Sequence, residues 1–107
     1  MVNLYYVSDG PRSVNVTLSE DGRRLRCMAE SNPTANYRWM PNNSGQAFGQ
    51  YAHSGQELEL CAIDNLQQLQ RLLCEVKNTA TNQTRTEAFN INATLRENIT
   101  SICSMYT

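Results

Sequence analysis

The sequence of 107 residues contains no long hydrophobic run and no concentration of one charge. A helix that crosses a bilayer needs about 20 consecutive apolar residues, so we expect no direct membrane insertion by this domain. Nine basic residues are balanced by ten acidic residues, and the basic ones are scattered except for a group at Arg23, Arg24 and Arg26. Nucleic acid is recognised by concentrated positive charge, so we expect no nucleic-acid partner.

Histidine and closely spaced cysteines are scarce as well. His53 is the only histidine. No two cysteines form a CxxC pair; the four are Cys27, Cys61, Cys74 and Cys103. Zinc sites need several such residues at short spacings, so we expect neither a metal nor another cofactor. We also expect no enzymatic activity, because no recognisable nucleophile accompanies His53 and the acidic pair Glu57 and Glu59 is typical of an exposed strand face.

Acceptor motifs for N-linked glycans, in contrast, are abundant. Five Asn-x-Ser/Thr sequences occur, where chance would give about two. Their asparagines are Asn15, Asn42, Asn82, Asn92 and Asn98. This excess favours an extracellular protein, and the rival interpretation is a cytosolic chain with accidental motifs. The N-terminus lacks the features of a signal peptide, so we expect an extracellular protein of this sequence to be a piece of a longer precursor.

Alternation of apolar and polar residues predicts about seven short strands separated by turn signals. The pattern is clearest over 14–18, 25–29 and 72–76, and the segment TRTEAFNINATL supplies the last strand. The side chains predicted to face the core are Leu25, Trp39, Leu58, Leu60, Leu72, Val76, Phe89, Ile91 and Ala93. Short strands without a convincing long helix favour an all-β antiparallel sandwich.

Cys27, Trp39 and Cys74 have the spacing of the immunoglobulin fold. The segments LRCMAESNPTANYRW, CEVKNTATNQT and LYYVSDGP resemble C2- or I-type domains of the carcinoembryonic-antigen-related adhesion molecules and membrane-proximal domains of the sialic-acid-binding Ig-type lectins. The resemblance implies an immunoglobulin-like two-sheet sandwich over 10–95, preceded by a linker or the end of another domain over 1–9 and followed by a tail over 96–107. It also implies a Cys27–Cys74 bond across the core, with Trp39 packed on it.

The chain departs from the family pattern before the second core cysteine. Such domains usually carry Asp-x-Gly-x-Tyr-x-Cys, in which the tyrosine hydroxyl closes a corner onto nearby backbone. The corresponding residues here are Gln68, Gln70 and Leu72. A short helical turn over 64–70, capped by Asp64 and seated through Leu66 and Leu69, is predicted in its place. The rival prediction is an unbroken helix over 66–76, which would abolish the sandwich.

Cys61 and Cys103 remain after the core pair implied by the resemblance. Cys61 follows the inward Leu60, so we expect it to point away from the core, where the C-terminal tail can reach it. Three outcomes stay open. They are an intrachain Cys61–Cys103 bond, an intermolecular bridge through Cys103, and free or artefactually paired thiols.

Aromatic residues are the candidate partner-binding groups. Tyr37, Phe48 and Tyr51 belong to a class enriched in protein interfaces, with a core position as the competing interpretation for Tyr37 and one other. Arg71 is interpreted as a surface residue and not as a carboxylate ligand. We expect glycans on three of the acceptors to cover the strands that bear them and to leave the other sheet open; these are Asn15, Asn82 and Asn92.

The resemblance implies an extracellular domain of a cell-surface adhesion molecule or receptor that carries N-linked glycans. Such a domain recognises a protein partner, homophilic or heterophilic, or acts as a spacer in a tandem array. The plasma membrane or the secreted state is then the expected location. Two alternatives stay open. One is a secreted or viral decoy receptor that captures a host ligand, and the other is a carbohydrate-binding β-sandwich.

Overall fold

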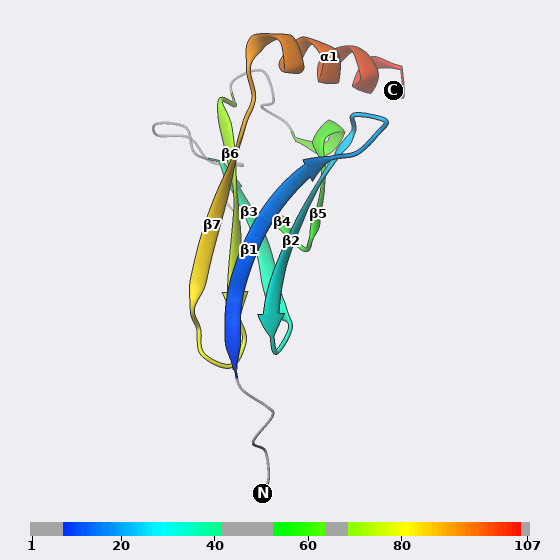
Figure 1. Ribbon diagram of the computed structural model, residues 1–107. Coiled ribbons are helices and arrows are strands. Elements are labelled where there is room, and N and C mark those ends of the chain that lie inside the picture. The colour runs from blue at the N-terminus through cyan, green and yellow to red at the C-terminus, as the bar shows by residue number, and fades with distance from the viewer. Residues whose placement is uncertain (1–7, 42–52, 64–68, 106–107) are drawn as a thin grey trace, which may run out of the picture.

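Two antiparallel β-sheets packed face to face form the body of the protein (Figure 1). A computed structural model describes residues 8–41, 53–63 and 69–105. The elements in chain order are β1 (Asp9–Leu18), β2 (Arg24–Asn32), β3 (Ala35–Pro41), β4 (His53–Ser54), β5 (Glu57–Glu59), the 3-10 helix η1 (Leu60–Ala62), β6 (Arg71–Asn78), β7 (Thr84–Asn90) and α1 (Ala93–Ser104). One sheet has the order β1-β2-β5 and the other β4-β3-β6-β7. The predicted all-β, immunoglobulin-like sandwich is confirmed.

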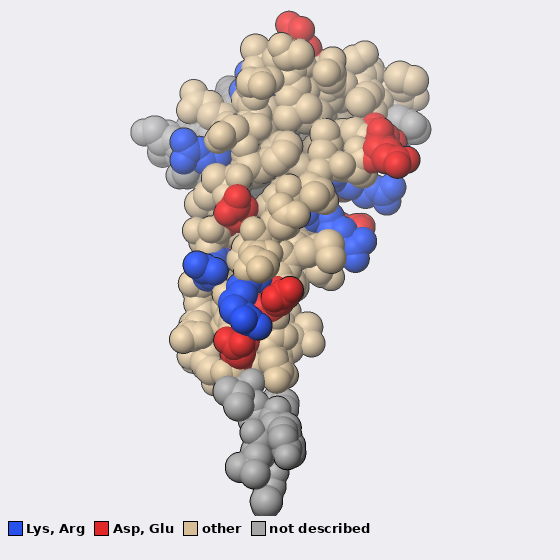
Figure 2. Space-filling model, viewed as in Figure 1, with Lys and Arg blue, Asp and Glu red and all other residues tan. Residues whose placement is uncertain are grey.

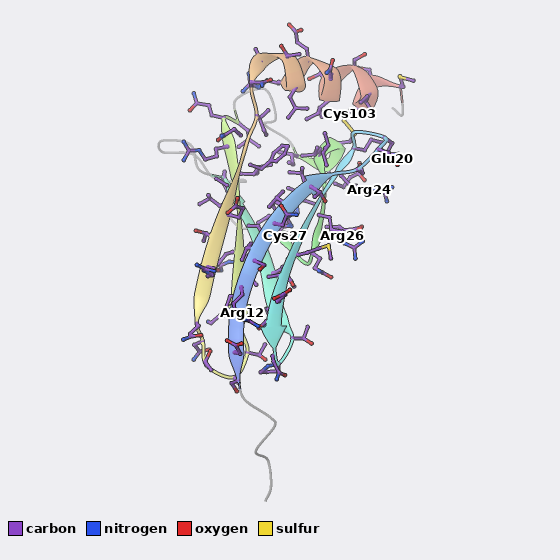
Figure 3. The ribbon with its side chains drawn as sticks, in the orientation of Figure 1. Arg12, Glu20, Arg24, Arg26, Cys27 and Cys103 are labelled. Atoms are coloured by element: carbon purple, nitrogen blue, oxygen red, sulfur yellow. A yellow bond between two sulfur atoms is a disulfide. The ribbon has the colours of Figure 1, made fainter. Side chains whose placement is uncertain are left out.

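The strands form where apolar and polar residues alternate, because successive side chains of a strand point to opposite faces. In β2, Leu25 and Cys27 are completely buried, whereas Arg24 and Arg26 project into solvent (Figure 3). The β2 register against β5 pairs Leu25 with Leu58, so both strands present their apolar side chains to the same core. This pattern fixes which face of the three-stranded sheet is outside.

The core is built around a disulfide that joins the two sheets. Cys27 of β2 is bonded to Cys74 of β6, and Trp39 beside them is completely buried. The indole Nε1 of Trp39 donates a hydrogen bond to the Gly55 carbonyl at 3.1 Å, which satisfies its one polar group. The other side chains expected in the core are buried as well: Leu25, Leu58, Leu60, Leu72, Val76 and Ile91. Phe89 is half-buried against them.

The C-terminal segment, expected to be a tail from residue 96, is instead an α-helix. α1 spans Ala93–Ser104 and lies across one end of the sandwich (Figure 1). Asn92, expected on the last strand, is the helix N-cap, and its side-chain oxygen accepts a hydrogen bond from the Leu95 N–H at 2.8 Å. Ala93, expected in the core, is exposed in the first turn of the helix. The strand prediction was therefore wrong beyond Asn90.

One face of α1 packs onto the sandwich. Ile99 is completely buried, and Leu95 and Cys103 on the same face are half-buried against the core. Gly22 in the β1–β2 turn has a φ of 75°, and a Cβ there would lie 2.8 Å from the Ile102 Cδ1 atom. The left-handed φ favours glycine at this position, and any larger residue would also require the Ile102 side chain to shift. The helix belongs to the domain and is not an appendage.

The corner before β6 is held by an arginine from α1. Leu72 occupies the position of the usual tyrosine and is completely buried. The Nη2 atom of Arg96 donates to the carbonyl oxygens of Leu69 at 2.6 Å and Ile91 at 3.1 Å. The Ile91 N–H also donates to the Gln70 carbonyl at 2.9 Å. Arg96 thus supplies, from a different element, the backbone contact that a tyrosine hydroxyl makes elsewhere.

The helical turn predicted over 64–70 falls mainly on 64–68, outside the described residues. The helical turn that the structure describes before the second core cysteine is η1 at Leu60–Ala62. Leu69, expected to seat the predicted turn, is buried. The rival helix over 66–76 is wrong, because β6 pairs in register with both β3 and β7.

A buried asparagine ties the other end of the sandwich together. Asn78 is completely buried at the end of β6. Its Nδ2 atom lies within hydrogen-bond distance of the carbonyl oxygens of Asp9, Gly10 and Asn32, at 3.1 to 3.3 Å. Its Oδ1 atom accepts from the Ala80 N–H at 2.8 Å. One side chain therefore links the start of β1, the end of β2 and the β6–β7 turn.

We expect Asn78→Ala to lower the free energy of unfolding by about 2 kcal/mol, because it removes the donor to the buried Gly10 carbonyl and to the partly buried carbonyls of Asp9 and Asn32. Urea denaturation followed by tryptophan fluorescence measures the change. Asn36→Ala, at an exposed position of β3, is the matched control and is expected to change stability by less than about 0.5 kcal/mol. Equal effects of the two substitutions would show that Asn78 does not link these strands.

Candidate recognition surface

Of the three aromatic residues proposed for partner binding, only Tyr37 is among the residues that the structure describes. Tyr37 is half-buried against the core, and its hydroxyl donates to the Ala29 carbonyl at 3.4 Å. Its ring therefore contributes chiefly to packing between the sheets. Phe48 and Tyr51 lie outside the described residues, so their part in binding stays a prediction.

The outer face of the four-stranded sheet carries an open groove of about 660 Å³. It runs over β3 and β6 and ends at the β4–β5 turn. The residues that line it are Thr34, Ala35, Asn36, Tyr37, Arg38, Ser54, Gly55, Gln56, Glu75 and Lys77. Most are polar, so the groove can make several directed hydrogen bonds to a ligand surface. Of these lining residues, only Tyr37 was predicted as a partner-binding group.

Opposite charges are paired across the centre of this face. Arg38 of β3 lies directly opposite Glu75 of β6, and their Nη2 and Oε1 atoms are 2.9 Å apart. Asn36 lies opposite Lys77, two residues further along the same strands and on the same face. The Arg38 side chain is 53% exposed and the Glu75 side chain 25%, so the arginine can also reach a second partner. Such a pair gives a binding surface orientation and specificity.

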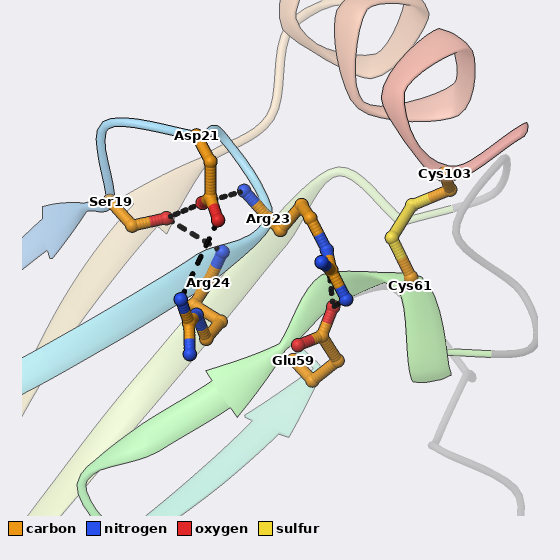
Figure 4. Close-up of polar contacts among 7 residues, drawn as sticks. All are labelled: Ser19, Asp21, Arg23, Arg24, Glu59, Cys61 and Cys103. Carbon is orange, nitrogen blue, oxygen red and sulfur yellow. Dashed lines mark hydrogen bonds and ion pairs between the residues drawn. A yellow bond between two sulfur atoms is a disulfide. The ribbon is translucent and has the colours of Figure 1, made fainter. Parts of the chain in front are cut away.

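A second group of charges lies in the β1–β2 turn near the Cys61–Cys103 disulfide (Figure 4). The Ser19 hydroxyl donates to the Asp21 carboxylate at 2.6 Å, and the Arg23 N–H donates to the same oxygen at 3.1 Å. These hydrogen bonds, aided by the positive charges of Arg24 and Arg23, lower the pKa of Asp21. Arg23 also contacts Glu59 at 3.3 Å. The charged side chains of Asp21, Arg23 and Arg24 all have partners within the turn or on the adjacent β5. This favours a structural role for the group over binding of a ligand.

The disulfide in Figure 4 is the intrachain outcome left open by the sequence. Cys61 in η1 is bonded to Cys103 in α1, and both are half-buried. It joins the helix to the turn that follows β5. Neither sulfur is then a free thiol.

Charges of both signs alternate on the face drawn in Figure 2, over β1, β2 and β7. Arg12 there lies 3.1 Å from Asp9 and 3.9 Å from Glu30. Mixed charge of this kind is typical of a solvated surface.

Two residues that the sequence analysis considered, His53 and Arg71, lie on the four-stranded sheet. His53 pairs with Trp39 where β4 joins β3, and Arg71 is exposed opposite Asn90. Neither residue lines the groove.

The glycan acceptors are distributed over both sheets and both ends of the sandwich. Asn15 is on β1, Asn82 is in the β6–β7 turn with a φ of 64°, and Asn92 and Asn98 are at the start and in the middle of α1. All four are exposed. Asn42 lies outside the described residues. The prediction that the acceptors cover one sheet and leave the other open was wrong, because they lie on β1, in the β6–β7 turn and on α1. None of the four described acceptors lines the groove.

Comparisons with protein-family models, with curated protein sequences and with solved structures find no match to this chain. Within the described ranges, no helix is long and apolar enough to cross a membrane. Two intrachain disulfides are typical of proteins that fold in an oxidising compartment.

Proposed function

We propose that the chain is a C2- or I-type domain from the ectodomain of a cell-surface adhesion molecule or receptor. The observation that carries the proposal is the Cys27–Cys74 bridge between the sheets with Trp39 buried against it. The strand order adds support. β4 pairs with β3 at the edge of the four-stranded sheet and not with β5, as expected when the short middle strand joins the sheet that contains the second cysteine.

The domain recognises a protein partner through the outer face of its four-stranded sheet. The polar groove and the exposed Arg38 guanidinium give this face directed contacts. None of the described glycan acceptors is among the residues that line the groove, which supports an accessible face. The same domain can also act as a spacer in a tandem array, which needs only a rigid sandwich. Homophilic and heterophilic recognition are both open.

The test is binding of the glycosylated, secreted domain to a panel of cells, measured by flow cytometry. We expect Arg38→Glu to reduce binding at least about tenfold, because it places two like charges together at the centre of the face. Lys77→Glu is expected to act in the same direction. Arg12→Glu is the matched control, since it reverses an exposed arginine on the other sheet, and we expect it to leave binding unchanged.

Treatment of the cells separates the classes of ligand. Binding that is lost after surface proteolysis and kept after removal of cell-surface glycans supports a protein partner. The opposite result supports the carbohydrate-binding alternative. Equal loss with Arg12→Glu and Arg38→Glu would reject the four-stranded face as the recognition surface. For homophilic recognition, sedimentation of the purified domain is expected to show self-association that Arg38→Glu abolishes.

A further inference from the structure

Met28 is an apolar side chain on the outside of the three-stranded sheet. It lies in β2, between the outward positions of Arg26 and Glu30, and it is 49% exposed. Among the large apolar residues of the described ranges, it shares this exposure only with Met105 near the C-terminus. The other large apolar residues of β2 and its neighbours face the core. Met28 is therefore the one large apolar side chain that the described part of this sheet leaves open to a covering group.

The residue directly across from Met28 is a glycan acceptor. The β1–β2 register pairs Asn15 with Met28 and Thr17 with Arg26. Residues opposite each other in an antiparallel pair project from the same face, with Cβ atoms about 4.5 to 5.5 Å apart. Val16, between the two motif residues, faces inward and is half-buried. Asn15 and Thr17 thus stand on the same open face as Met28.

The side of Met28 away from β1 is also open. β5 pairs with β2 only at Arg24–Arg26, and the hydrogen bond from the Cys27 N–H to the Gln56 carbonyl continues this pairing by one residue. The next residue, Gly55, has no side chain, and a Cβ placed there would meet no atom within 4 Å. A bulky group on Asn15 therefore has room over Met28.

We infer that Asn15 carries an N-linked glycan whose first sugar packs over Met28. This inference rests on the proposed extracellular function, because the modification needs the secretory pathway. A membrane-bound oligosaccharyltransferase catalyses the transfer. In this step the Asn15 amide nitrogen attacks the anomeric carbon of an oligosaccharide that is linked to a lipid diphosphate. The N–C bond forms, the C–O bond to the diphosphate breaks, the amide nitrogen loses one proton, and the lipid diphosphate leaves. No oxidation or reduction occurs.

The first sugar, N-acetylglucosamine, matches this position in size and chemistry. Its ring presents C–H groups on one face and hydroxyls at its rim, so it can cover an apolar side chain while staying hydrated. The cross-strand distance is short enough for a ring attached to the Asn15 side chain to lie on the neighbouring strand. The glycan then removes the one exposed large apolar side chain of this sheet from water and from protein contact.

Oxidation of Met28 by hydrogen peroxide measures this cover, because a shielded thioether forms its sulfoxide more slowly. The domain is secreted from cultured cells, and peptide mass mapping follows each methionine. We expect Met28 to oxidise about threefold more slowly in the glycosylated protein than in Asn15→Gln. Trimming the glycans to one N-acetylglucosamine is expected to preserve the protection. Met105, which follows α1 and is 75% exposed, is the internal control and is expected to oxidise equally in both proteins.

Substitutions at Thr17 distinguish the effect of the glycan on Met28 oxidation from the effect of the Asn15 side chain. Thr17→Ser keeps the acceptor motif and is expected to keep Met28 protected. Thr17→Val removes the motif with Asn15 intact, and Met28 is then expected to oxidise as fast as in Asn15→Gln. Equal oxidation of Met28 with and without the glycan would overturn the inference. So would an unmodified Asn15 in protein that is modified at Asn82. Neither readout needs a binding partner, so loss of the proposed recognition would leave these results unchanged.

Discussion

Replacing Cys27 and Cys74 together by alanine is expected to lower the free energy of unfolding by about 4 kcal/mol from loop closure alone. The two cysteines are 47 residues apart, and the bond between them restricts the unfolded chain. Both sulfurs are completely buried, so their removal also leaves a cavity beside Trp39. Chemical denaturation followed by tryptophan fluorescence measures the loss, because the indole lies at the site of change.

The second disulfide is a matched control for this experiment. Cys61 and Cys103 are 42 residues apart, so the loop-closure contribution of the two bonds is nearly equal. The second bond is half-buried at the edge of the domain, where solvent or neighbouring side chains can fill the space. We therefore expect the double alanine variant at Cys61 and Cys103 to be more stable than the core variant by about 1 to 2 kcal/mol.

The difference in the free energy of unfolding between the two double alanine variants measures the contribution of packing, because the loop-closure contribution is nearly the same in both. A larger loss for the core pair means that the sulfur atoms stabilise the protein by filling the space between the sheets. Equal losses would show that loop closure accounts for both bonds and that the sheets close over the missing atoms. A smaller loss for the core pair would contradict the central place of this bridge in the fold.

The strands could be predicted because the signal for them is local. Alternation at Leu25 and Cys27 fixes which side chains are buried, and a one-residue shift would expose all of them. The same reasoning placed Leu58 and Val76 in the core, where the structure has them. The sandwich followed from these alternations together with the spacing of the cysteines to Trp39.

The C-terminal helix was missed although its signals are present. Asn92 was interpreted as a strand residue and a glycan acceptor, but it also has the chemistry of a helix N-cap. Leu95, Ile99 and Ile102 follow at the three- and four-residue spacing of one helical face. β-branched threonines and isoleucines weaken helix propensity. The start of the helix was therefore interpreted as the end of the last strand, and the remainder from residue 96 as a tail.

The candidate recognition surface could not be located from the sequence, because it depends on the register between strands. Arg38 and Glu75 are far apart in the chain and meet only through the β3–β6 pairing. The same is true of Asn15 and Met28, whose relation follows from the β1–β2 register. Tyr37, a candidate by residue type, lines the groove while its ring is half-buried against the core. Neither pairing has a local signature.

Replacing Arg96 by methionine is expected to lower the free energy of unfolding by about 3 kcal/mol. Methionine keeps an apolar stem of similar length but has no donor for the carbonyl oxygens of Leu69 and Ile91. Hydrogen bonds from a charged donor to partly buried carbonyls are worth about 1.5 to 3 kcal/mol each, and the two here share one nitrogen. Leu72 stands where the usual tyrosine would hold the corner before β6, so no tyrosine hydroxyl at that position can compensate.

Two further variants show whether the loss belongs to this corner. Arg85→Met removes an exposed arginine from β7 and is expected to change stability by less than about 0.5 kcal/mol. Leu72→Tyr in the Arg96→Met background places the usual tyrosine back at the corner, and recovery of part of the lost stability would show that the two side chains serve the same purpose. Amide hydrogen exchange at Ile91, whose N–H is bonded to Gln70, is expected to accelerate in Arg96→Met. Unchanged exchange there, together with unchanged stability, would contradict the assignment of the corner to Arg96.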